Sequence, residues 1–207
     1  MNSGNSEDID EIIKFISKAY FETVKENYEN FESAFSRFRR TQERIFSYEF
    51  YCQMRNIQKS GKFGFLKNDK LKIHAEIIKS DNPSKKIHGK QPDIILHSPG
   101  NNEDNLLVME VKRIDAPPEN IKKDLKKLKD FIEDEKLKYK YGILLIFGEI
   151  SNENGNIWNL IKNKIKEEDS NDDNLKLLDY IKNQKIIILW CHDSVCKNIS
   201  SFLVEGN

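Results

Sequence analysis

The chain has 207 residues, and its 34 basic and 34 acidic side chains give a formal net charge of zero. This length suffices for one domain with a hydrophobic core, and 10% aromatic residues with only five prolines exclude a wholly disordered chain. The neutral total excludes a uniformly basic nucleic-acid coat protein, although it is compatible with a local basic surface.

Membrane and disulfide-rich classes are also disfavoured. No apolar run reaches the length of about 18 residues that a membrane span needs, so we expect none. The N-terminal stretch MNSGNSEDIDE lacks the apolar core of a signal peptide, and the expected compartment is the cytoplasm. Three cysteines are too few for a disulfide framework. We expect Cys191 and Cys196 to be core residues, since the spacing around His192 does not suit zinc.

Helices are predicted over two segments within the first 58 residues. Apolar residues recur in steps of three and four over residues 8–38, which indicates one long amphipathic helix or two, with an acidic outer face. Such a helix serves either for packing or for dimerisation. A second helix is predicted over 41–58. Its buried stripe comprises Phe46, Phe50, Met54 and Ile57.

Strands dominate the next segment. The pattern predicts them over 71–79, 92–97 and 106–112, separated by a basic loop and by the turn-forming sequence SPGNNEDN. A helix over 119–137 and a continuous apolar strand at 141–148 follow. The remaining predicted elements are polar helices near 155–167 and 174–183, a buried strand at 185–192 and a short terminal helix.

Two carboxylates are predicted to face each other in the hairpin at 92–112. If its loop is symmetric, His97 faces Leu106, and the same register places Asp93 opposite Glu110. Directly opposed side chains have Cβ atoms about 5 Å apart, and like charges there are destabilising. Lys112 follows Glu110 by two residues and therefore shares its face of the sheet.

A divalent cation would account for this arrangement. Carboxylate oxygens suit Mg²⁺ or Mn²⁺, and such an ion can polarise a phosphoryl oxygen and activate a bound water. A neighbouring lysine can stabilise charge that develops on phosphate. The chemistry is that of phosphodiester hydrolysis. The alternative is an accidental ion pair at the edge of a sheet, with Glu110 paired to Lys112.

The motif Pro92-Asp93 followed by Glu110-Val111-Lys112 resembles the signature of the PD-(D/E)XK nuclease superfamily. The resemblance implies an α/β fold with a restriction endonuclease-like αβββαβ core and a mixed central sheet. It covers about half of the chain, and the N-terminal helix and the C-terminal α/β extension are predicted from the sequence pattern alone. The predicted elements over 41–148 follow that order. The implied division is a helical arm over 1–40 and a nuclease-like domain over 41–207, whose extension begins at residue 149.

The resemblance also assigns roles to residues. Asp93 and Glu110 would bind Mg²⁺ (with Mn²⁺ as a substitute), together with the backbone carbonyl of Val111, and Lys112 would position or activate the attacking water. Family members often add an acid from the first core helix, for which Glu49 is the candidate and Glu43 the fallback. The helix after the motif often adds a lysine or glutamine. Here Lys122, Lys123 and Lys126 compete for that role.

The neutral total charge conceals an uneven distribution. Residues 37–90 carry 14 basic and 5 acidic side chains, whereas residues 1–36 carry 3 and 8. A basic segment leading into the Asp93 strand suits a phosphate backbone, so DNA is the expected partner, with RNA as an alternative. The candidate contacts are Arg40, Arg44, Lys85, Lys86, Lys90, Lys122 and Lys126. The alternative function is a non-cleaving module that binds nucleic acid or protein, and a homodimer through the first helix remains open.

Overall fold

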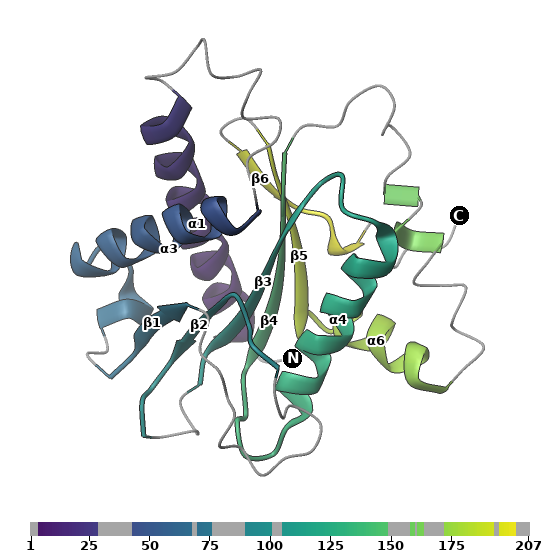
Figure 1. Cartoon of the computed structure of the whole chain (residues 1–207). Helices are drawn as coiled ribbons and strands as arrows, with labels where there is room; N and C mark the ends of the chain where they lie inside the picture. The colour runs from purple at the N-terminus through teal and green to yellow at the C-terminus, as the bar shows by residue number, and fades with distance from the viewer. Residues whose placement is uncertain are drawn as a thin grey trace.

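The computed structural model of the chain describes residues 4–28, 43–67, 70–75, 90–100, 105–148, 158–159, 161–163, 172–192 and 195–201. An initial pair of helices precedes three consecutive strands, after which a helix, a strand, a further helix and two final strands follow (Figure 1). The elements are α1 (Gly4–Tyr28), α3 (Glu43–Lys59), a 3₁₀ turn (Gly64–Lys67), β1 (Lys72–Ala75), β2 (Ile94–His97), β3 (Leu107–Arg113), α4 (Pro118–Glu133), β4 (Tyr141–Phe147), α6 (Asp172–Lys182), β5 (Ile186–His192) and β6 (Val195–Asn198).

One mixed sheet of six strands organises the molecule, and its strands lie in chain order from β1 to β6. Neighbours pair antiparallel at both ends of the sheet, in β1–β2, β2–β3 and β5–β6. The central pairs β3–β4 and β4–β5 are parallel. A parallel pair needs a crossover connection, and α4 provides it between β3 and β4. The predicted α/β class with a mixed sheet is therefore confirmed.

Helices cover both faces of the sheet. In Figure 1, α1 and α3 lie on one side of the strands, and α4 and α6 lie on the other. Successive strand residues alternate between two hydrophobic cores, because side chains in a strand point to opposite faces. In β3, Met109 and Val111 join the core under α1 and α3, whereas Val108 joins the core under α4.

The first helix is part of the main core. Its apolar stripe, including Ile12, Phe15 and Ile16, is buried against α3 and the sheet. The interpretation of this stripe as a packing surface is confirmed for residues 8–25, and α3 buries the four residues predicted for it. Residues 29–38 of the predicted helix lie outside the described residues.

Helix α4 ends earlier than its pattern predicts. The expected range was 119–137, but the helix stops at Glu133. Asp134 has an extended backbone, and its Oδ1 accepts hydrogen bonds from the backbone N–H groups of Lys136 and Leu137 at 3.0 Å each. A short aspartate side chain offers the backbone such an alternative to helix, which explains the early end.

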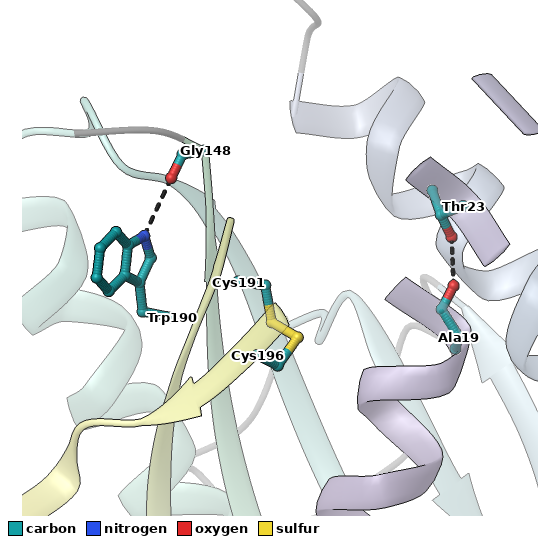
Figure 2. Close-up of a disulfide and its surroundings, with 6 residues drawn as sticks. All are labelled: Ala19, Thr23, Gly148, Trp190, Cys191 and Cys196. Atoms are coloured by element: carbon teal, nitrogen blue, oxygen red, sulfur yellow. Dashed lines mark hydrogen bonds between the residues drawn. A yellow bond between two sulfur atoms is a disulfide. The ribbon is translucent and has the colours of Figure 1, made fainter. Parts of the chain in front are cut away.

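The C-terminal end contains a strand that the pattern did not predict. Where a short helix was expected after residue 192, β6 pairs antiparallel with β5, and helical backbone begins only at Ser200. The register sets Cys191 opposite Cys196, and a disulfide joins them (Figure 2). The expectation of two core cysteines is wrong in this respect: Cys191 is buried, but Cys196 is only half-buried and covalently paired. Spacing alone did not reveal the hairpin that brings them together.

Figure 2 draws two further hydrogen bonds, one from β5 near the disulfide and one within α1. Trp190 on β5 donates its indole N–H to the carbonyl of Gly148, just beyond β4, at 3.0 Å (Figure 2). On α1, the Thr23 hydroxyl donates to the Ala19 carbonyl at 2.8 Å.

Among the described helices, none combines the length and apolar character required to cross a bilayer.

Candidate active site

The hairpin register agrees with the prediction. Strands β2 and β3 pair Ile94 with Met109 and Leu96 with Leu107, and one further step places Asp93 opposite Glu110. Asp93 lies immediately before β2, where its Oδ2 accepts a hydrogen bond from the backbone N–H of Val111 at 2.7 Å. This bond fixes one acid of the motif directly against the strand that carries the other two motif side chains.

Glu110 is buried on the α4 face of the sheet. It is only 2% exposed, and its Oε1 has no hydrogen-bond partner within the described part of the chain. Its other oxygen, Oε2, pairs with the ammonium group of Lys127 at 2.7 Å. A buried carboxylate with one unsatisfied oxygen is costly, so it is a position where a ligand would be stabilising.

Lys112 forms a bridge between two helices. Its ammonium lies 2.5 Å from Glu43 Oε1, at the start of α3, and 3.3 Å from Asp124 Oδ2, on α4. The lysine is therefore held between acids from both helical layers. Lys112 lies two residues after Glu110 on the same strand face, so its ammonium is anchored next to the opposed acids Asp93 and Glu110.

Helix α4 contributes two residues that the sequence analysis missed, Asp124 and Lys127. Of the lysines considered there, Lys123 and Lys126 are exposed and Lys122 is buried, while Lys127 pairs with Glu110. Residues three apart lie on neighbouring positions of a helix surface. Asp124 and Lys127 have this spacing and adjoin the buried Leu125 and Leu128, so the phase of the apolar stripe could have identified them.

Of the two acids considered on α3, the fallback lies at the site. Glu43 contacts Lys112, whereas Glu49 accepts a hydrogen bond from Gln53 at 3.1 Å, one turn further along the same helix. Six residues separate the two acids, which corresponds to about 120° around the helix axis. The preference for Glu49 over Glu43 is not supported by this geometry, because only Glu43 is on the helix face directed at β3.

The pKa values of Asp93, Glu110 and Asp124 are raised at this site. Burial raises the pKa of Asp93, although the Val111 N–H and the two lysines oppose it. Burial raises the pKa of Glu110 well above its usual range, and the charge of Asp93 adds to this effect. Burial likewise raises the pKa of Asp124. All three carboxylates are thus less stable as anions here than in water.

For Lys112, the neighbouring acids and not burial determine the direction of the pKa shift. Burial on its own would lower the pKa of the ammonium, but the hydrogen bond from Lys112 to Glu43 and the charges of Asp124 and Glu43 outweigh burial and raise it. The side chain therefore stays protonated at neutral pH. It can donate hydrogen bonds and stabilise negative charge, but it cannot act as a general base in this arrangement.

Charge balance favours an additional cation. When all groups are ionised, the acids Asp93, Glu110, Asp124 and Glu43 outnumber the ammonium groups of Lys112 and Lys127 by two. Within the described residues, no group of three or more His, Cys, Asp or Glu side chains converges as a ready metal site. The available donor set is thus the opposed pair, and Mg²⁺ commonly uses only one or two carboxylates plus water and substrate oxygens.

The candidate nucleic-acid contacts are only partly described. Arg40, Lys85 and Lys86 lie outside the described residues. Lys90 forms an ion pair with Asp130 on α4, so its charge is partly neutralised. Arg44 is exposed beside Glu43, and Lys126 is exposed on α4.

Val111 and His97 have structural contacts. The Val111 side chain is buried in the core under α1 and α3, and its N–H holds Asp93. His97, at the far end of β2, lies with its Nε2 2.8 Å from Nδ1 of His74. The backbone carbonyl of Val111 thus remains the only part of that residue available for the metal-binding role that the motif implies.

Comparison with protein-family models, with curated proteins and with solved structures finds no match to this chain. Fold alone does not specify function, because the same architecture carries many activities. The function therefore depends on the geometry of the site. Asp93 and Glu110 oppose each other, and Asp124 and Lys127 of α4 contact Lys112 and Glu110, respectively.

Proposed function

We propose that the protein is a metal-dependent nuclease of the PD-(D/E)XK type that hydrolyses phosphodiester bonds of DNA. The observation that carries the proposal is the opposition of Asp93 and Glu110 on neighbouring strands, with Lys112 held beside them. Like charges in this position are destabilising in a purely structural role. They are useful where a cation and a phosphate must be bound together.

The order of elements supports the same proposal. Helix α3, strands β1 to β3, helix α4 and strand β4 follow in the sequence expected for a restriction endonuclease-like core, and the motif lies at the start of β2 and in β3. On this view α1 is an N-terminal addition, and α6, β5 and β6 form the C-terminal extension.

The residues present suit a hard divalent cation. Asp93, Glu110 and the Val111 carbonyl would hold it, and the unsatisfied Glu110 Oε1 fits a ligand role. When bound, Mg²⁺ or Mn²⁺ would polarise a phosphoryl oxygen and lower the pKa of a coordinated water. The raised pKa values of Asp93 and Glu110 are consistent with acids that gain stability when a cation is nearby.

Lys112 orients groups and supplies positive charge. Its contacts with Glu43 and Asp124 fix the ammonium in space, so its position costs no reorganisation when charge develops on the phosphate. The remaining N–H can donate to a phosphate oxygen or to the attacking water. Glu43 and Asp124 act through Lys112 and are positioning residues.

A second function, binding without cleavage, is favoured by one observation. Lys127 already occupies one side of Glu110 as an internal cation, and Lys112 is paired with two acids. An internal ion-pair network of this kind would serve the fold of a module that binds nucleic acid or protein. The two functions differ in whether DNA is cut in the presence of a divalent cation.

The decisive experiment uses the purified full chain with labelled DNA and Mg²⁺ or Mn²⁺. We expect cleavage that stops with EDTA. Lys112→Met should reduce the rate by at least about 100-fold, the range found when an electrostatic stabiliser is removed. Lys136→Met, which removes an exposed lysine beyond the end of α4, is the matched control and should leave the rate unchanged.

Two results would count against the nuclease. Cleavage that persists at the full rate in Asp93→Asn, Glu110→Gln and Lys112→Met would place the activity elsewhere. DNA binding in a gel shift, without cleavage by any metal, would instead favour the binding module.

A further inference from the structure

A small cavity opens beside Asp93, on the side away from α4. Its volume is about 330 Å³. It lies between the first turns of α3, the end of β1 and the segment that leads into β2. The residues that line the cavity include Glu43, Arg44, Ser47, Tyr48, Gln91 and Asp93. The cavity therefore shares two acids with the candidate active site and extends from it towards the surface.

The two sides of this cavity differ in character. Asp93 and Glu43 form the inner, acidic side, where Glu43 holds Lys112. The outer side carries the Tyr48 ring, which is 40% exposed, and the exposed Arg44. A large aromatic side chain left this accessible next to a cluster of buried charges offers a flat surface for a ligand.

Arg44 is fixed at one edge of that ring. Its Nη2 and Nε donate to the Tyr48 hydroxyl at 2.9 and 3.2 Å, and the guanidinium carbon lies 5.5 Å from the ring centroid. Since both bonds reach the hydroxyl, the guanidinium is at the hydroxyl end of the ring. The wall thus combines a positive charge with an aromatic surface, a combination that suits a phosphate and its base.

The size of the cavity limits what can enter. About 330 Å³ is at the lower end of the range for small-ligand sites, which is about 300 to 1,000 Å³. This volume suits a single nucleotide but not a stacked base pair. A base inside a duplex can enter such a cavity only if it is extruded, which breaks its stacking and its base pair.

We infer that this cavity binds one unpaired nucleotide adjoining the scissile phosphate, with its base against Tyr48 and its phosphate near Arg44, so that the preferred substrate is single-stranded, flapped or bulged DNA. The inference rests on the proposed nuclease function, because it assigns the substrate class to the same site. Tyr48 is then a residue that determines specificity, and it takes no part in the chemistry.

The first test compares cleavage of three labelled substrates that share one sequence: a perfect duplex, the same duplex with a short flap, and the single strand. We expect the wild type to cut the two substrates with unpaired bases at least about five-fold faster than the duplex. Tyr48→Ala should slow cleavage of the flap and single strand by roughly 5- to 100-fold, the value of one stacked base, and slow cleavage of the duplex by much less.

Two variants control for other effects. Tyr48→Phe retains the ring and loses the hydroxyl, so it should keep most of the preference. Ile45→Ala removes an exposed apolar side chain, 58% exposed, from the same helix turn but outside the cavity, so it should behave as the wild type. Equal cleavage of duplex and unpaired DNA, or equal loss in Tyr48→Ala and Ile45→Ala, would overturn the inference while the nuclease function stood.

The second test does not depend on cleavage. A single-stranded oligonucleotide containing 2-aminopurine is titrated with protein in Ca²⁺, and stacking of the base is followed by fluorescence quenching. Quenching by the wild type and Tyr48→Phe, but not by Tyr48→Ala, would support the cavity as a base site even if no DNA is cut. Absence of quenching with the wild type would refute it.

Discussion

The two faces of the sheet differ in the side chains that they bury, although the same strands form both. Under α1 and α3, the sheet face is continuously apolar, and Phe50 and Phe15 are fully buried. Under α4, the apolar core contacts a group of charged residues formed by Asp93, Glu110, Lys112, Asp124 and Lys127. Apolar residues of similar volume in these places would often be neutral or stabilising. The contrast indicates that both faces stabilise the fold through an apolar core, and that the second face also carries a group of charges that stability does not explain.

The largest expected effect tests the apolar face. Phe50→Ala should reduce the free energy of unfolding by about 3–5 kcal/mol, because a fully buried ring is removed and the packed site cannot collapse completely. Urea denaturation followed by circular dichroism measures the change. Phe21→Ala, at a ring 36% exposed on α1, should change it by less than about 0.5 kcal/mol. A loss below about 1 kcal/mol for Phe50→Ala would show that this face does not stabilise the fold.

A smaller effect of opposite sign tests the charged face. Glu110→Gln should raise the free energy of unfolding at neutral pH, because the folded state disfavours the ionised carboxylate. A carboxyl whose pKa is raised on folding loses stability as the pH rises above its unfolded value, here 4.5. The advantage of the variant should therefore vanish in acid and grow as the pH rises from the unfolded pKa to the raised folded pKa.

The matched control for this titration is Glu135→Gln, at an exposed glutamate just after α4. It should show no comparable dependence on pH. A Glu110→Gln variant less stable than the wild type at pH 7.5 would mean that the Lys127 ion pair outweighs the cost of burial.

The smallest expected effect concerns the cation. For a dissociation constant of about 1 mM, 10 mM Mg²⁺ stabilises the folded protein by about 1.4 kcal/mol, which raises Tm by roughly 3 °C for a chain of this size. Differential scanning fluorimetry at constant ionic strength measures the shift. Asp93→Asn should abolish it. An equal shift in wild type and variant would place the bound ion away from the opposed acids.

Much of this architecture was predictable from local pattern. The stripe of Phe46, Phe50, Met54 and Ile57 follows from spacing, because apolar residues of a packed helix repeat with its period. The strand at 141–147 follows from its continuous apolar run, which is typical of a strand buried on both faces. The opposition of Asp93 and Glu110 was predictable for a similar reason. Strand side chains alternate with period two, so the symmetry of one short turn sets every pair in the hairpin.

Other features depended on how the elements pack. The position of α3 over the sheet determines that Glu43 reaches Lys112 while Glu49 bonds to Gln53. The rotation of α4 about its axis selects Lys127 among several nearby lysines. The hairpin that joins Cys191 to Cys196 is only four residues long on its outer strand, too short for a clear periodic signal.

The features predictable from the sequence differ from those decided by packing in the distance along the chain over which the interactions act. Backbone hydrogen bonding and side-chain periodicity act between near neighbours in the chain, so the helices, the central strands and the paired acids of the motif are already encoded in short segments. Ion pairs such as Lys112–Glu43 join residues 69 positions apart. Their partners are set by helix rotation and docking against the sheet, which the packing of both cores determines together.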